Sequence, residues 1–160
     1  MRREILVAKI VTTIIIALTL VGIARADEKI DVLFRKYRAP AGLIAIVESA
    51  GEKFGIDPKI IASIIVVESS ARPKAVSKGG DYGLMQVRWK VHKKDIQRRF
   101  PTVKTAEDLL EPSINVAIGT EIFARYQQGR TLRDALLRYS GGNRTMADRV
   151  LRILRGLLLP

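Results

Sequence analysis

The chain has 160 residues, a formal net charge of +12 and no cysteine. This length suggests a single domain, and the lack of cysteine excludes disulfide bonds and a lipid-modified lipoprotein. No nucleic-acid-binding motif accompanies the positive charge, so we expect no nucleic-acid partner. The charge then indicates either anionic partners, whose encounter it accelerates, or simply a gain in solubility.

Residues 1–26 have the three-part pattern of a secretory signal. A basic start is followed by an almost wholly apolar run over residues 10–24, and Ala24 and Ala26 place small side chains where a signal peptidase reads them. The run is shorter than the ~20 residues of a membrane-spanning helix, so an uncleaved anchor is the less favoured alternative. We therefore predict export by a Sec-type signal, a mature domain over residues 27–160, and a periplasmic or cell-envelope location.

The mature region predicts helix after helix, with no internal repeat and no long alternating stretch typical of a sheet. The polar residues 27–40 are expected to be irregular or briefly helical. The other expected elements, bounded by capping, glycine and proline signals, are helices over 41–54 and 58–69, a loop over 70–82, a helix or turn near 84–98, a short helix after the capping signal Thr105–Asp108, helices over 112–129 and 131–139, and a last helix from Thr145. The fold class is therefore all-α, with a single domain that can hold a cleft.

The last predicted helix is basic on one side and apolar on the other. Its two faces are Arg149, Arg152 and Arg155 against Val150, Ile153, Leu154 and Leu157. Such a helix can make peripheral contact with a membrane surface. Docking of the apolar face on the core is the alternative that we favour.

Glu68 stands at the end of the helix expected over residues 58–69, which is apolar nearly all round and should be buried. It follows Ile64 by four residues and Ile61 by seven, and so shares their face. Burial and the negative end of the helix dipole both raise the pKa of Glu68, which suits a general acid near neutral pH. An exposed glutamate in a fraying last turn is the alternative.

A loop rich in glycine and short polar residues follows this glutamate. The pattern E-S-x-x-x-P-x-A-x-S-x-x-G-x-x-G-L-M-Q runs from Glu68 to Gln86. It resembles the signature of the lytic transglycosylases with a soluble-lytic-transglycosylase (SLT), goose-lysozyme-like catalytic domain. The segments Asn115–Gly119 and Ala135–Gly142 resemble two further motifs of that family in the expected order. The resemblance spans about residues 42–143.

This resemblance implies a lysozyme-like fold that cleaves the β-1,4 bond between N-acetylmuramic acid and N-acetylglucosamine in peptidoglycan glycan strands. Glu68 would protonate the glycosidic oxygen and then accept the proton of the muramic acid 6-hydroxyl, which closes into a 1,6-anhydro end. One carboxyl group suffices, whereas most glycosidases use a pair. By match to family positions, Ser77, Met85, Gln86 and Tyr139 would bind the substrate, with the Tyr139 hydroxyl orienting Glu68.

Each of these substrate-binding assignments has a structural alternative. Ser77 and Gln86 could instead form hydrogen bonds within the loop, and Met85 and Tyr139 could pack in the core. We expect no cofactor and no metal, because the lone histidine, His92, has no metal-binding spacing around it.

Asp81 is the candidate for a second carboxylate, at a position where the family usually has a small residue. Opposite Glu68 it could activate a water and make a hydrolytic muramidase, although its glycine-rich turn beside Lys78 favours an exposed structural role. A third alternative is a non-catalytic wall-binding or assembly protein, which the presence of Glu68 disfavours. The expected biological role is local cell-wall remodelling or penetration, and secretion, conjugation or phage machinery are compatible partners.

Overall fold

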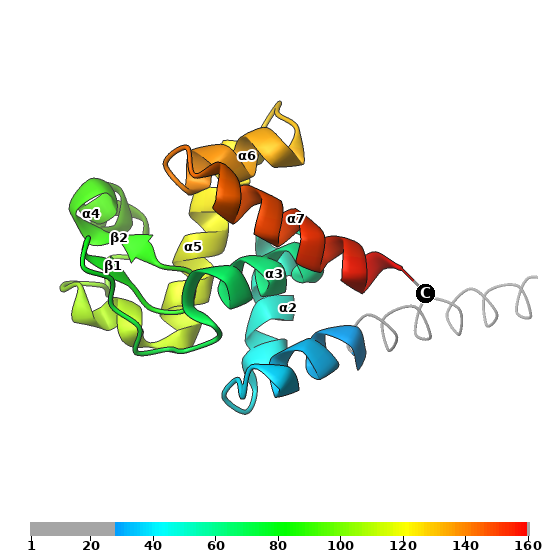
Figure 1. Cartoon of the computed structure of the whole chain (residues 1–160). Coiled ribbons are helices and arrows are strands. Elements are labelled where there is room, and N and C mark those ends of the chain that lie inside the picture. The colour runs from blue at the N-terminus through cyan, green and yellow to red at the C-terminus, as the bar shows by residue number, and fades with distance from the viewer. Residues whose placement is uncertain (1–27, 160) are drawn as a thin grey trace, which may run out of the picture.

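The computed structural model describes residues 28–159, so the predicted signal segment over residues 1–26 lies outside the described part. The described chain is built almost wholly from helices, which confirms the all-α class (Figure 1). A helix over 28–36 is followed by α2 (Leu43–Phe54), α3 (Pro58–Ser69), α4 (Trp89–Arg99), the 3-10 helix η1 (Glu107–Leu110), α5 (Pro112–Gln127), α6 (Leu132–Tyr139) and α7 (Arg144–Leu158). Within residues 28–159, none of these helices combines the length and the apolar character needed to cross a bilayer.

Helix α3 is the centre of the fold. Its start is fixed as expected, because the Asp57 side chain accepts a hydrogen bond from the Lys59 backbone N–H at 2.8 Å and Pro58 occupies the first helical position. Nearly every side chain between Ile60 and Val66 is buried. Helices α2 and α7 pack directly against α3, and α2 also packs on α5 (Figure 1). The larger hydrophobic cluster forms among these helices.

Helix α7 docks its apolar stripe on this cluster, which is the alternative that we favoured. Val150, Leu154 and Leu157 are buried, whereas Arg149, Arg152 and Arg155 on the other side are exposed. A membrane contact by this helix stays a prediction. The helix begins one residue earlier than expected, because the Asn143 side chain caps it by accepting a hydrogen bond from the Met146 N–H at 3.0 Å.

A second, smaller hydrophobic cluster lies among α4, η1 and α5. Its buried members are Val87, Ile96, Val103, Leu109, Ile118 and Ile122. Helix α5 serves both clusters, since Val116 and Phe123 belong to the larger one and Ile118 and Ile122 to the smaller one. Ile114, Ile118 and Ile122, spaced four residues apart on α5, therefore form one stripe that faces the smaller cluster.

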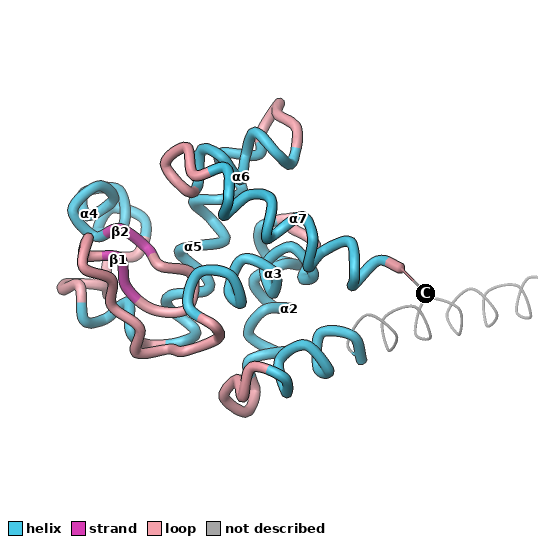
Figure 2. The backbone as a smooth tube through the Cα atoms, viewed as in Figure 1, coloured by secondary structure: helices cyan, strands magenta, loops and turns pink. Residues whose placement is uncertain are grey.

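A short β-hairpin covers this smaller cluster and was not expected from the sequence. Strands β1 (Asp81–Tyr82) and β2 (Val87–Arg88) pair antiparallel, with Asp81 opposite Arg88 and Tyr82 opposite Val87 (Figure 2). Strands of two residues are too short to show an alternating pattern, which explains why no periodicity predicted them.

The capping signal at Thr105–Asp108 works differently from the prediction. Asp108 Oδ2 accepts hydrogen bonds from the backbone N–H groups of Lys104 and Thr105, at 2.8 and 2.9 Å, and the hydroxyl of Thr105 makes no capping bond to the backbone of this turn. The carboxylate at the end of the signal therefore fixes the turn, and the short helix that follows is 3-10.

Candidate active site

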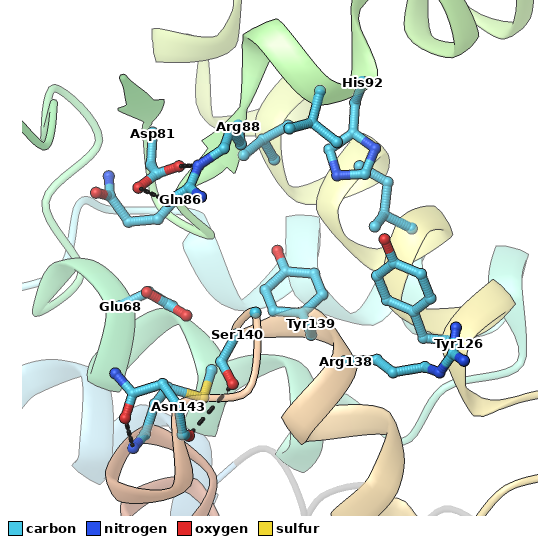
Figure 3. A pocket seen from close by; sticks show the side chains of 15 residues that line it. Glu68, Asp81, Gln86, Arg88, His92, Tyr126, Arg138, Tyr139, Ser140 and Asn143 are labelled. Atoms are coloured by element: carbon cyan, nitrogen blue, oxygen red, sulfur yellow. Dashed lines mark hydrogen bonds and ion pairs between the residues drawn. The ribbon is translucent and has the colours of Figure 1, made fainter. Parts of the chain in front are cut away.

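A pocket of about 360 Å³ opens where the two hydrophobic clusters meet. Its walls come from the end of α3, the β-hairpin, α4, α5, α6 and the loop between α6 and α7 (Figure 3). Val87 and Ile122 of the smaller cluster and Met146 of the larger one contribute apolar surface.

Glu68 lies in the last turn of α3 with its carboxyl group at one side of the pocket (Figure 3). The chain turns sharply after it, because Ser70 and Ala71 both adopt positive φ angles of 53° and 57°. The pKa of Glu68 is raised to about 7, mainly by burial, as the sequence predicted, and then by the negative charge of Asp81, against opposing effects of Arg149 and Arg88. At neutral pH, Glu68 can therefore both donate and accept a proton.

Asp81 lines the same pocket and is not the exposed turn residue that the sequence favoured. Its side chain is 17 % exposed and is held by Arg88 through two hydrogen bonds, Nε to Oδ1 at 2.6 Å and Nη2 to Oδ2 at 3.0 Å. The Ser77 hydroxyl donates a third bond to Oδ2 at 2.9 Å. Burial acts to raise the pKa of Asp81, but the bonds from Arg88 and Ser77 outweigh it and lower the pKa. Asp81 is therefore an ionised carboxylate with three of its roughly four acceptor sites occupied.

Ser77 lies behind this carboxylate and does not line the pocket. Its hydroxyl oxygen also accepts hydrogen bonds from the backbone N–H groups of Gly79 and Asp81, at 3.2 and 3.0 Å. The side chain thus stabilises the turn, which was the structural alternative for this residue. A sugar contact by Ser77 stays a prediction.

Gln86 lines the pocket beside Asp81 (Figure 3). Its backbone has a φ of 50°, uncommon for a residue with a side chain. The side-chain amide nitrogen donates to the carbonyl groups of Gly83 and Ala75, at 2.9 and 3.2 Å, which fixes the plane of the amide. Gln86 therefore has both a loop-stabilising role and a position compatible with the predicted substrate contact.

Met85 does not line the pocket, contrary to the prediction. Its side chain is 0 % exposed and packs against Gly119, where an added Cβ would come within 2.7 Å of the sulfur. The backbone of Met85 is held from both sides, because its N–H donates to Asn115 Oδ1 at 2.7 Å and its carbonyl accepts from the Tyr139 hydroxyl at 2.8 Å. The three motif segments of the sequence thus converge on Met85, which anchors the loop that carries Gln86.

Tyr139 lines the middle of the pocket, but its hydroxyl is bonded to the Met85 carbonyl and does not orient Glu68 through a hydrogen bond of its own. Burial and then the charge of Glu68 raise the pKa of Tyr139 well above its usual value. The ring also packs edge-on against Phe123, with centroids 5.9 Å apart. Tyr139 therefore forms a rigid wall close to Glu68.

Six polar residues of the pocket were not identified as site residues from the sequence: Arg88, His92, Tyr126, Arg138, Ser140 and Asn143. They come from different helices, the hairpin and the loop between α6 and α7, so no single spacing along the chain connects them. The sequence signal that could have pointed to Arg88 is the opposite charge of Asp81 seven residues earlier. Within residues 28–159, no group of three or more His, Asp or Glu side chains is placed to hold a metal ion.

Comparison with known proteins agrees with this geometry. The family model described as "Transglycosylase SLT domain" matches residues 45–152. Two similar curated proteins, from Citrobacter koseri and Salmonella paratyphi B, are both named "Endo-type membrane-bound lytic murein transglycosylase A" and are 34 % and 35 % identical to this chain over 86 residues. Each match covers 52 % of this chain and 42 % of the relative, so the chain spans less than half the length of the curated relatives it matches.

Proposed function

The chain belongs to the transglycosylase SLT domain family, and on that premise we propose that it is a peptidoglycan lytic transglycosylase with Glu68 as its acid and base. One observation carries the proposal. Glu68 has a pKa of about 7 at a pocket whose other carboxylate, Asp81, is engaged by Arg88 and Ser77. A site with one available carboxyl group suits a reaction that needs one proton carrier.

In this mechanism, the protonated Glu68 gives its proton to the glycosidic oxygen as the bond from the muramic acid anomeric carbon to that oxygen breaks. The N-acetyl group of the substrate supports the positive charge that develops. The resulting Glu68 carboxylate then accepts the proton of the 6-hydroxyl, whose oxygen bonds to the anomeric carbon. Glu68 is thereby protonated again, no water is consumed, and the products are a 1,6-anhydromuramoyl end and a free hydroxyl on N-acetylglucosamine.

The pocket walls supply candidate positioning groups for this reaction. We assign Gln86 to a hydrogen bond with a sugar hydroxyl or acetamido group, because its amide plane is fixed by Gly83 and Ala75. We assign the Tyr139 ring to a packing contact with a sugar face, because it lines the pocket next to Glu68 and is held rigidly by the Met85 carbonyl.

A hydrolytic muramidase is the second candidate, favoured by the position of Asp81 in the same pocket. To activate a water, Asp81 would have to act as a base through the one acceptor site that its three hydrogen bonds leave open. Both of its oxygens accept hydrogen bonds from Arg88, and Oδ2 accepts another from Ser77. Its lowered pKa also makes it a weak base. These observations favour transglycosylation.

We also propose that the protein is exported and acts in the cell envelope, on local wall remodelling or penetration. The signal-like pattern over residues 1–26 supports export, and peptidoglycan lies outside the cytoplasmic membrane. The basic surface would favour encounter with anionic wall polymers. Secretion, conjugation or phage machinery are compatible partners.

The test is digestion of purified peptidoglycan by the wild-type protein and by Glu68→Gln and Asp81→Asn variants, followed by mass spectrometry of the released muropeptides. We expect products lighter than hydrolysed muropeptides by one water from the wild type and from Asp81→Asn, and none from Glu68→Gln. Products with reducing ends that disappear in Asp81→Asn would replace the proposal with the hydrolytic mechanism. No release by the wild type would leave the non-catalytic wall-binding role.

A further inference from the structure

The pocket continues past Tyr139 to a group of polar side chains that the proposed reaction does not use. His92 comes from α4, Tyr126 from α5 and Arg138 from α6, and all three line the pocket. We call this group the basic end of the pocket. In Figure 3, Glu68 lies on one side of Tyr139, and Tyr126 and Arg138 lie on the other. The basic end and Glu68 therefore belong to the same pocket, with Tyr139 between them.

Arg138 gives this end a positive charge that forms no ion pair with an acid of the described residues. The carboxyl groups that line the pocket are Glu68 and Asp81, and the charge of Asp81 is matched by Arg88. Within residues 28–159, Arg138 has no ion-pair partner. A cation without an internal counterion on a pocket wall favours an anionic ligand.

The acids on neighbouring elements are paired with other arginines. Asp95 is paired with Arg98 and Arg125, and Glu121, which is only 8 % exposed, is paired with Arg99 and Arg125. Asp134, one helical turn before Arg138 on α6, accepts a hydrogen bond from the Thr131 hydroxyl at 2.6 Å and forms no ion pair with Arg138. None of these three acids is therefore paired with Arg138.

The donor chemistry at the basic end suits a carboxylate. The planar guanidinium of Arg138 can donate two parallel hydrogen bonds to the two oxygens of a carboxylate. The Tyr126 hydroxyl, which has no hydrogen-bond partner within the described residues, can donate a third. Burial and the charge of Arg125 lower the pKa of His92, so its neutral ring can donate one hydrogen bond without adding charge.

We infer that the basic end binds a carboxylate of the stem peptide carried by the muramic acid that is cleaved. This inference rests on the proposed function. In peptidoglycan, the stem peptide is attached through the lactyl group of muramic acid, so it starts on the same sugar whose glycosidic bond breaks when Glu68 donates its proton. A substrate with stem peptides would then bind better than a bare glycan strand.

The first test measures binding with the Glu68→Gln protein, so that no cleavage disturbs the measurement. Three ligands are compared by titration calorimetry: a muramyl disaccharide with its stem peptide, the same molecule with its carboxyl groups converted to amides, and the disaccharide without peptide. We expect the first ligand to bind about tenfold more tightly than the other two, as for one charge-assisted bidentate contact. Equal binding of the first two ligands, or no measurable binding of the first, would overturn the inference.

The second test adds Arg138→Gln or Tyr126→Phe to the same protein, with Arg152→Gln as the matched control. Arg152 is exposed on α7, loses the same charge, and does not line this pocket. We expect Arg138→Gln to remove most of the preference for the charged ligand, Tyr126→Phe to remove part of it, and Arg152→Gln to leave it unchanged. Equal losses in Arg138→Gln and Arg152→Gln would mean that overall charge is responsible and would refute a specific site.

Cleavage by the wild-type protein separates this inference from the proposed function. If the wild type releases anhydro products equally fast from intact peptidoglycan and from peptidoglycan stripped of stem peptides by an amidase, the proposed function stands and the carboxylate site fails. If the wild type binds the charged ligand selectively but releases no product from either substrate, the site stands as a binding site and the proposed function fails.

Discussion

Replacing Glu68 with glutamine is expected to stabilise the protein at alkaline pH and to have much less effect at acidic pH. In the folded protein the pKa of Glu68 is about 7, against an ordinary value of 4.5. Between these two values the unfolded chain loses the proton of Glu68 and the folded chain keeps it. Because the folded state then binds more protons, its stability falls as pH rises through this window. Below pH 4 the two states are protonated alike and the effect vanishes.

The size of the effect follows from the pKa difference. A shift of about 2.5 units corresponds to about 3.4 kcal/mol at 1.36 kcal/mol per unit, which is an upper limit. Glu68 is partly exposed, and solvent screening reduces the expected value to about 2 kcal/mol above pH 7. A glutamine at this position carries no titratable group, so its stability should lack this pH-dependent loss.

The measurement is urea unfolding of the wild type and Glu68→Gln at pH 4 and pH 8, followed by circular dichroism and by the fluorescence of the single tryptophan, Trp89. We expect the variant to gain about 2 kcal/mol over the wild type between the two pH values. Glu52→Gln, which changes an exposed glutamate at the end of α2, controls for the substitution itself. A difference between variant and wild type that is the same at both pH values would refute the burial argument for Glu68.

Three further predictions follow from the site. The rate of glycan cleavage should fall about tenfold between pH 6 and pH 8, because the protonated fraction of a group with a pKa of about 7 falls by that factor; a rate that still rises at pH 8 would exclude Glu68 as the acid. Asp81→Asn should move this decline to lower pH, since it removes a negative charge that raises the pKa of Glu68 and frees Arg88, and an unchanged pH–rate profile would contradict that coupling. Asn115→Ala should lower the free energy of unfolding by about 3 kcal/mol in urea, because its buried side chain makes three hydrogen bonds, to Met85, Tyr82 and Leu109; a loss below about 1 kcal/mol would mean that water replaces them.

The helices of the larger cluster could be predicted from the sequence because their signals are local. Asp57 and Pro58 mark the start of α3, and its almost uninterrupted apolar residues could only be buried. The β-hairpin could not be predicted in the same way. Its strands are two residues long, and their pairing depends on the ion pair between Asp81 and Arg88 and on the turn at Gly83.

The candidate site could be predicted where its residues belong to one continuous motif. Glu68 and Gln86 line the pocket as expected. Met85, the residue directly before Gln86, is instead buried in the hydrophobic core. In a loop without periodicity, nothing in the sequence tells which neighbouring side chain faces the pocket and which faces the core. Arg138 and Tyr126 reach the pocket from separate helices, so only the packing of α5 against α6 brings them together.

The convergence of the three motif segments on Met85 explains why most of their residues do not reach the pocket. Asn115 fixes the backbone N–H of Met85, Tyr139 fixes its carbonyl, and the absence of a side chain at Gly119 leaves room for the methionine. These contacts hold the loop against α5 and α6, and the loop in turn places Asp81 where its charge acts on Glu68. A change at Asn115 or Gly119 would move the loop and so alter the pKa of Glu68 without removing a group that lines the pocket. The motif segments therefore specify a rigid support for one acid, and they add to it the two residues assigned to the substrate, Gln86 and Tyr139.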